Sequence, residues 1–207
     1  MEKTSRTPQS AQPAADTYRS ATRPPRRQRA AAPQPGTAPV GEPLLAHDGR
    51  QLLLRAIQPG DAAALRRAFA RLTPEQIRAR FFYRMSELSE ALAARLSDPD
   101  PQTTAAFVVV DADGAEIRAE ARIYVDETTA AAEFAIAVDP AFTGQGLGRA
   151  LMLRLIEESR RRGLAEMWGD VLAGNHAMLD FVRHLGLAPT IEHGDEASVV
   201  RVRFALS

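Results

Sequence analysis

The sequence predicts an α/β fold of the α+β kind, with a mixed, mostly antiparallel sheet flanked by helices, and three observations support it. Hydrophobic residues make up 45% of the 207, which is enough to build a sizeable core. Three β-like runs follow one another at 105–111, 115–125 and 130–138, separated by the turn signals "DG" and "DETT". Helical patterns lie before and after these runs, and the longest begins directly after the third run.

The elements before the three runs can be predicted in order. Residues 50–58 form an apolar run that ends at a Pro-Gly pair and reads as a strand. Asp61 is expected to cap a helix over 62–72, whose apolar positions recur at helical spacing. Thr73 opens a second helix, with proline at its first position, and Ser89 opens a third. The early part of the domain is therefore one strand followed by three short helices.

The elements after the three runs complete the domain. A long helix leads from a glycine-rich stretch to Gly163. A strand at 165–172, a helix at 175–186 that is capped by Asn175, and a final strand at 197–206 follow. The predicted order is β-α-α-α-β-β-β-α-β-α-β, which describes one domain.

Residues 46–207 are predicted to form this domain, and residues 1–45 a disordered tail. The tail is rich in Pro, Ala, Arg and Gln and has few large apolar side chains, so it cannot bury enough surface to offset the entropy of ordering. Its arginines favour a solvated tail over a tether to nucleic acid or an acidic partner.

Composition excludes several classes of function. There is no cysteine, which rules out disulfides and thiolate chemistry, and the four histidines lack metal-ligand spacing, so no metal site is predicted. The formal net charge is zero, which gives no bias toward nucleic acid or acidic membranes. Neither a membrane span nor a secretory signal is apparent. We expect a cytoplasmic protein that is a monomer or a dimer.

The stretch "VDPAFTGQGLGRALMLRLIEESRRRG" places glycines at 144, 146 and 148, directly before the long helix. Free backbone N–H groups at a helix start can surround an anion, and glycine lets the anion approach closely. The spacing fits neither GxGxxG nor a Walker A sequence. A phosphate cradle of another kind is therefore predicted, rather than an ordinary helix cap.

This stretch closely resembles the acetyl-CoA loop of the GNAT superfamily of N-acetyltransferases, and "AGNHAMLDFVRHLGL" resembles the second motif of that family. The resemblance covers about residues 46–207. It implies acetyl-CoA as co-substrate and an amine as acceptor. Residues that it and the strand geometry assign to acetyl-CoA are Ile136, Val138, Thr143, Gly144, Gln145, Gly146, Leu147, Gly148, Arg149 and Asn175. Asn175 could contact the cofactor or only cap its helix.

A finer resemblance connects the segments 80–100, 132–140 and 175–187 with the acetyltransferase domain of the Pat-type bacterial protein-lysine acetyltransferases. It favours a protein lysine as acceptor, with a small-molecule amine as the other possibility. Two departures from the general family pattern, Thr143 for Gln or Arg and Val182 for Tyr, leave open a non-catalytic sensor of acetyl-CoA. The Pat-type resemblance itself implies a small apolar residue at 182.

Glu133 is the predicted catalytic base, since a protonated amine is not a nucleophile and must lose its proton. It lies in an apolar strand, about 16 Å along the backbone from Val138 at about 3.3 Å per residue, which suits the length of an extended pantetheine arm. Partial burial would raise the pKa of this carboxyl group toward neutrality. The alternative is a structural glutamate on the wetter face of the strand, with Asp170 or Glu120 as weaker candidates.

Overall fold

The computed structural model describes residues 40–126, 128–193 and 198–206. Most of the predicted tail, residues 1–39, lies outside these ranges. The remainder of that predicted segment differs from expectation, because Glu42–Leu45 forms a strand that pairs with the next one. The sheet thus begins before residue 46.

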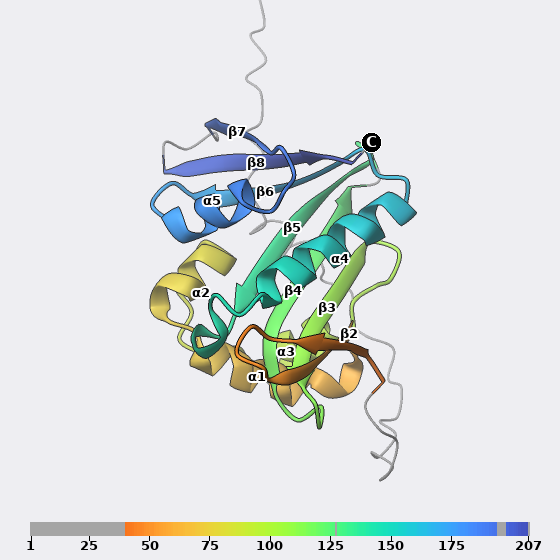
Figure 1. Ribbon diagram of the computed structural model, residues 1–207, viewed down its shortest axis with the longest axis vertical. Helices are drawn as coiled ribbons and strands as arrows, with labels where there is room; N and C mark the ends of the chain where they lie inside the picture. The colour runs from red at the N-terminus through yellow and green to blue at the C-terminus, as the bar shows by residue number, and fades with distance from the viewer. Residues whose placement is uncertain (1–39, 127, 194–197, 207) are drawn as a thin grey trace, which may run out of the picture.

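A mixed sheet runs through the whole domain in the order β1-β2-β3-β4-β5-β6-β8-β7 (Figure 1). Every neighbouring pair is antiparallel except β5 and β6, which are parallel. The predicted class is therefore confirmed. The strands are β1 Glu42–Leu45, β2 Gln51–Ala56, β3 Thr104–Asp111, β4 Ile117–Asp126, β5 Ala131–Val138, β6 Glu166–Leu172, β7 Thr190–His193 and β8 Val199–Ala205.

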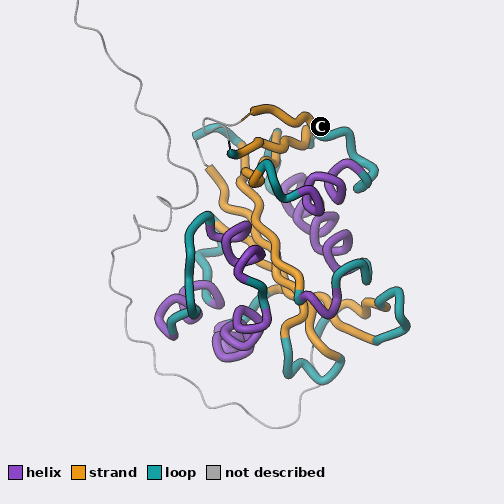
Figure 2. Tube along the Cα trace, turned by 90° about the vertical axis from the view of Figure 1, so that its left-hand side faces the viewer, coloured by secondary structure: helices purple, strands orange, loops and turns teal. Residues whose placement is uncertain are grey.

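Helices cover both faces of the sheet (Figure 2). They are α1 Ala62–Arg71, α2 Pro74–Phe81, α3 Glu90–Ser97, α4 Leu147–Arg161 and α5 His176–Arg183. Alternation along β3 and β4 divides the apolar side chains into two cores: Val108 packs with α1, α2 and α3, whereas Val109 packs with α4. We call these two sides of the sheet the α1–α3 face and the α4 face.

The helix starts follow the sequence signals at Thr73, Ser89 and Asn175, and they differ in part at Asp61. Thr73 accepts from the backbone N–H of Gln76 in a capping box, and Ser89 caps α3 through the N–H of Leu92. Asp61 is the N-cap residue of α1 by position, as expected, but its side chain does not cap the helix. Its carboxylate makes no capping bond to α1, because it accepts from Arg55 instead, at 2.6 and 2.8 Å.

The sheet forks between β5 and β6. These strands pair only over residues 131–133 and 166–168, although β5 stays paired with β4 as far as Val138 and β6 with β8 as far as Leu172. Gly169 lies just past the last pair, and a Cβ there would come within 2.7 Å of the Phe134 ring. An aromatic ring thus fills the α4 face at the fork, while the backbone edge of β5 beyond it has no strand partner on that side.

Candidate active site

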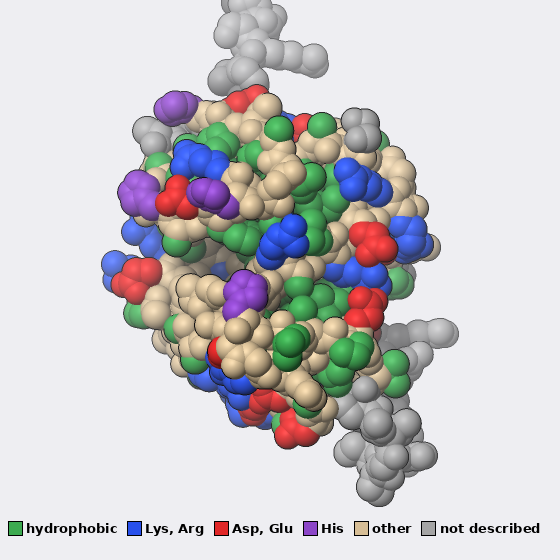
Figure 3. Space-filling view, in the orientation of Figure 1, with side chains coloured by type: hydrophobic (Ala, Val, Ile, Leu, Met, Phe, Trp, Pro, Cys, Tyr) green, Lys and Arg blue, Asp and Glu red, His purple; other side chains and the backbone are tan. Residues whose placement is uncertain are grey.

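A cavity of about 540 Å³ lies beside the free edge of β5. Its walls come from the second half of β5, the glycine loop, α2, α5 and the turn between β1 and β2. Figure 3 shows a hollow on this face, between the part of the molecule that carries α5 and the part that carries α2. The volume and the apolar floor suit a cofactor of considerable length.

The glycine loop leads from β5 into α4 through a short 3₁₀ helix, Pro140–Phe142. Gly146 is the N-cap residue of α4, with φ of +87°, and Gly144 has φ of +76°. Both angles lie in the left-handed region, where a Cβ is unfavourable. The first N–H groups of α4 have no partner within the helix and carry the positive end of its dipole, so they can bind an anion.

The crowding around Gly146 has a specific cause. A Cβ at Gly146 would lie 2.9 Å from Nε2 of His47, whereas nothing lies within 4 Å of a Cβ at Gly144. Gly148 is different again, since a Cβ there would make an ordinary contact of 3.6 Å with Phe181. The loop therefore needs glycine at 146 both for its backbone angle and for the space that His47 occupies.

The turn between β1 and β2 is bonded to the glycine loop at three points. Nδ1 of His47 lies 3.0 Å from the carbonyl oxygen of Gly144, and the backbone N–H of His47 donates to the carbonyl of Gln145 at 3.3 Å. The N–H of Asp48 donates to Oε1 of Gln145 at 3.0 Å. The side chain of Gln145, which the sequence assigns to the cofactor, is thus bonded to this turn.

Asp139 supports the loop from beneath. It is buried, and Oδ1 accepts from the N–H of Ala141 at 3.0 Å, which caps the 3₁₀ helix. Its other oxygen, Oδ2, accepts from Nε of Arg71 at 2.7 Å, and Arg118 lies 3.5 Å from the same oxygen. The base of the loop is therefore held by an ion-pair network that reaches α1.

Of the two roles that the sequence leaves open for Asn175, the structure shows the helix cap, and it places the residue at the cavity. Its Oδ1 accepts from the N–H of Met178 at 3.2 Å, which caps α5, and the residue also lines the large cavity. On the opposite wall, Nε2 of Gln76 donates to the carbonyl oxygen of Val138 at 3.1 Å. That bond uses one acceptor position of the backbone predicted to meet the pantetheine arm.

Glu133 lies at the fork of the sheet. It is the last residue of β5 in register with β6, where it pairs with Trp168. On the other side of β5, it pairs with Tyr124 of β4. It lines a second cavity of about 60 Å³, and this cavity shares Ile136 and Asn175 with the large one. The two cavities adjoin, so a group extending along β5 would end near the Glu133 carboxyl group.

The surroundings of Glu133 shift its ionisation. Burial, and then the nearby Asp170 carboxylate, raise the pKa of Glu133 to about 7, while Arg80 and Arg201 act in the opposite direction. Asp170 is held in place by Arg201 through two bonds of 2.8 Å. A carboxyl group with a pKa near neutrality can accept a proton and release it at the same pH.

Most of the residues assigned to acetyl-CoA line one cavity. They are Ile136, Val138, Thr143, Gly144, Gly146, Leu147, Gly148, Arg149 and Asn175. Val182, where many GNAT proteins carry a tyrosine, is fully buried in α5. His47 and Gln76 also line the cavity, but they lie far from the loop in the sequence and no motif marks them.

The geometry is that of an acyltransferase with a nucleotide-type cofactor: a helix start that can bind phosphate, a cavity along a free strand edge, and a half-buried carboxyl group at its end. Residues 63–187 match the acetyltransferase (GNAT) family. The chain belongs to that family. It is an acetyltransferase that uses acetyl-CoA as co-substrate and acetylates an amine.

Relatives of known sequence agree with this assignment. The chain is 32% identical over 164 residues to acetyltransferase PA5475 of Pseudomonas aeruginosa, a match that covers 77% of this chain and 86% of the relative. A shorter match, 45% identical over 65 residues, is to the ribosomal protein bS18-alanine N-acetyltransferase of Escherichia coli and covers 31% of this chain and 42% of that protein.

Solved structures share the fold. The GNAT domain of PAT from S. lividans superposes with a TM-score of 0.72 at 24% identity, covering 80% of this chain and 96% of that domain. The yncA protein of Salmonella typhimurium, solved with its cofactor acetyl-CoA, has a TM-score of 0.60 at 19% identity and covers 75% of this chain and 94% of that one.

Two further findings hold for the described residues. None of their helices combines the length and the apolar character needed to cross a membrane. Within the same ranges, histidines and carboxylates form no cluster of three that could hold a metal ion.

Proposed function

We propose that Glu133 is the general base of the transfer, and that the loop from Thr143 to Arg149 binds the pyrophosphate of acetyl-CoA. The pKa of about 7 at a half-buried carboxyl group beside the cofactor cavity is the observation that carries this proposal. The amides at the start of α4 would supply the anion site, and the free edge of β5 near Ile136 and Val138 would bond the pantetheine arm, as an added strand does.

The proposed reaction is direct. Acetyl-CoA supplies a thioester, whose C–S bond breaks as the acceptor nitrogen forms a bond to the carbonyl carbon. Glu133 takes the proton from the acceptor amine, either directly or through one water molecule. Val182 offers no proton to the departing sulfur. The thiolate of coenzyme A therefore leaves without a side-chain acid at that position, which is feasible since a thiolate is a good leaving group.

We infer that the acceptor is a primary amine on an unbranched chain, with a protein lysine as the leading candidate. The cavity beside Glu133 is about 60 Å³, which favours a narrow aliphatic arm. The bS18 relative is named for the acetylation of an alanine of a ribosomal protein, so it supports a protein acceptor, while the choice of lysine rests on the Pat-type resemblance. A small polyamine is the second candidate, because the structure of a spermidine N-acetyltransferase chimera shares the fold with a TM-score of 0.58.

One assay, made on the full chain and on a variant, tests this proposal. Release of coenzyme A from acetyl-CoA is followed with lysine peptides, spermidine and free amino acids as acceptors, for the full chain and for Glu133→Gln. We expect peptide-dependent release that falls by a factor of at least 10² in Glu133→Gln, which is typical of a lost general base. The exposed Glu87→Gln serves as the matched control. Full turnover in Glu133→Gln would exclude the base.

If the chain binds acetyl-CoA but releases no coenzyme A with any of the three classes of acceptor, the proposed acceptors are contradicted. The division into a tail and a domain, the cytoplasmic location and the monomeric or dimeric state are further parts of the proposal. Sedimentation of the purified full chain tests the last of these.

A further inference from the structure

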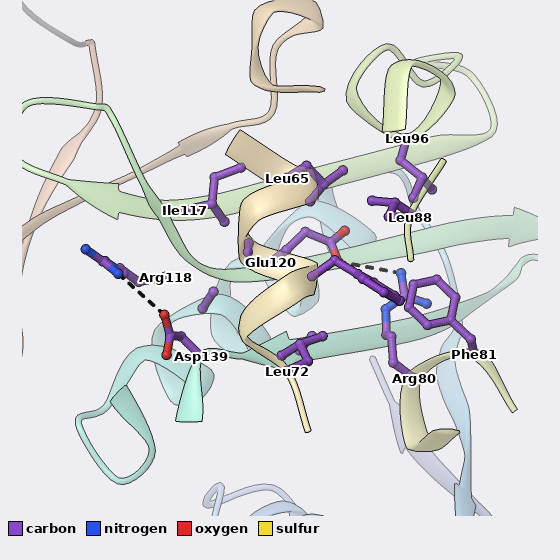
Figure 4. Close-up of a pocket in the computed structure, with 14 residues that line it drawn as sticks. Leu65, Leu72, Arg80, Phe81, Leu88, Leu96, Ile117, Arg118, Glu120 and Asp139 are labelled. Carbon is purple, nitrogen blue, oxygen red and sulfur yellow. Dashed lines mark hydrogen bonds and ion pairs between the residues drawn. The ribbon is translucent and has the colours of Figure 1, made fainter. Parts of the chain in front are cut away.

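Arg80, in the last turn of α2, is buried with one donor unused. Its side chain is 7% exposed, and one of its terminal nitrogens lies 3.5 Å from Oε2 of Glu120 (Figure 4). Among the described residues, its Nε has no hydrogen-bond partner. An unused donor in a buried guanidinium is costly, so its retention calls for an explanation.

Arg80 belongs to a buried group of three charges on the α1–α3 face. Oε1 of Glu120 accepts from Nε of Arg122 at 2.5 Å, and Arg122 also donates to the carbonyl of Leu96 at 3.2 Å. Burial alone would raise the pKa of Glu120, but the guanidiniums of Arg122 and Arg80 hold it below its usual range. Glu120 is thus ionised, and two positive charges stand against one negative charge.

The excess positive charge needs a partner, because an uncompensated buried charge is strongly unfavourable. Arg122 is fully committed, since it is 1% exposed and bonded to Glu120 and to α3. Arg80 has the longer, weaker contact with Glu120 and lines two cavities. One is a partly open, mostly apolar cavity of about 40 Å³ beneath α1, and the other is the cavity that Glu133 lines.

We propose that Arg80 is the positioning residue for the base: it supplies the positive charge that keeps the Glu133 carboxyl group available in its ionised form beside the acceptor. Glu120 orients Arg80 through their ion pair. This inference rests on the proposed role of Glu133 and adds a residue to it. The direction of α2 supports it, because Gln76, one turn earlier on that helix, is bonded to Val138 of the same strand.

Charged groups from several elements surround Glu133. The charged and titratable groups around Glu133 are Arg80 on α2, Arg122 and Tyr124 on β4, Asp170 on β6 and Arg201 on β8. The two residues of the α5 segment in this cavity, Asn175 and Met178, are uncharged. Asp170 forms two bonds with Arg201, which offset in part the negative charge that it presents to Glu133. The charge of Arg80, by contrast, is only partly offset at 3.5 Å from Glu120.

The test compares the pH dependence of kcat/KM in variants of the full chain. At low pH, kcat/KM falls as Glu133 is protonated, and we call this part of the pH profile its acidic limb. In Arg80→Gln, Glu133 loses a favourable positive charge and holds its proton to higher pH. The acidic limb should therefore shift to higher pH by about one unit. Arg80→Lys keeps the charge and should retain the position of the limb. Arg78→Gln, on the exposed side of the same helix, is the matched control.

Glu120→Gln tests the same inference from the other side. It removes the negative charge that partly offsets Arg80, so the guanidinium acts more strongly on Glu133. The acidic limb of kcat/KM should therefore shift to lower pH. Opposite shifts in Arg80→Gln and Glu120→Gln cannot come from loosened packing, which would affect both variants alike. Binding of acetyl-CoA by calorimetry verifies that each variant is folded.

An unmoved limb in Arg80→Gln, with kcat/KM reduced equally at every pH, would overturn the inference. So would shifts of the same sign in both variants. If Arg80→Gln does not fold, Glu120→Gln decides alone, and an upward shift or no shift in that variant counts against the proposal. Failure of the base itself is distinguishable, because Glu133→Gln would then retain its turnover.

Discussion

His47 and Gly144 are joined across 97 residues of sequence by a 3.0 Å hydrogen bond between Nδ1 of the imidazole and the backbone carbonyl. The bond ties the turn after β1 to the glycine loop before α4, and Asp48 adds a second tie to Gln145. Because the N–H groups of a loop bind an anion well only when they are held in position, this contact links the first hairpin to the cofactor site.

His47→Ala should therefore weaken coenzyme A binding without unfolding the domain. Loss of one hydrogen bond and of the ring beside Gly146 predicts a rise in Kd of about fivefold, or about 1 kcal/mol. Isothermal titration of acetyl-CoA measures it, with the exposed His193→Ala as the control. Equal affinities of the two variants would show that the turn does not support the loop.

The contact of His47 with Gly146 predicts a coupled pair. Gly146→Ala should weaken binding more than Gly144→Ala, since both change a left-handed residue but only the first also meets the imidazole. In the double variant His47→Ala/Gly146→Ala, the clash between the Cβ at residue 146 and the imidazole is absent. The double variant should therefore bind acetyl-CoA more tightly than the sum of the two single effects predicts. Strict additivity of the two binding energies would contradict a direct contact.

The Asp170 carboxylate should shift the acidic limb of the kcat/KM profile to higher pH. Burial and then Asp170 raise the pKa of Glu133 to about 7. Asp170→Asn removes the second cause and leaves the positive charge of Arg201 nearby, so the acidic limb of kcat/KM should move down by about one pH unit. The measurement is the rate of coenzyme A release between pH 5 and 9. An upward shift would mean that Asp170 acts on Glu133 by another route.

The base is also predicted to destabilise the fold above neutral pH. The pKa of Glu133 is about 7 in the folded protein against 4.5 for an ordinary glutamate, so the folded state loses relative stability as pH rises from 4.5 through 7. Glu133→Gln should gain about 1–3 kcal/mol in the free energy of unfolding at pH 8 and little at pH 5. Urea unfolding at both pH values measures this, and an equal effect at both would refute it.

The class of fold and the cofactor loop could be predicted because their signals are local. The period along α4 and the spacing of the loop glycines lie within one short stretch. The two strands absent from the prediction, β1 and β7, are the two edges of the sheet. Each has four residues, and mostly exposed positions leave no alternation to detect.

The walls of the site were harder to predict for a related reason. His47, Gln76 and Arg80 reach the cavities from elements far from the loop, and only the folded sheet brings them together. Asp61 shows the same limit at smaller scale, since a tertiary ion pair with Arg55 displaces the expected cap. A sequence pattern records what a residue prefers locally, whereas these roles depend on contacts across the fold.

The fork of the sheet offers a last test, because its geometry depends on one glycine. A Cβ at Gly169 would lie 2.7 Å from two atoms of the Phe134 ring, and that ring is itself packed 5.9 Å from the ring of Phe204. The ring cannot swing away like the end of a flexible side chain, so Gly169→Ala should cost about 1–3 kcal/mol of stability through overpacking.

The matched control is Gly174→Ala, since a Cβ at Gly174 meets nothing within 4 Å. Urea unfolding should separate the two variants clearly. Gly169→Ala should also lower kcat more than it raises the KM for acetyl-CoA. The reason is that Phe134 is adjacent to Glu133 in β5, whereas the glycine loop follows the other end of that strand. If Gly169→Ala is as stable as Gly174→Ala, the close packing of the fork does not fix the position of the base.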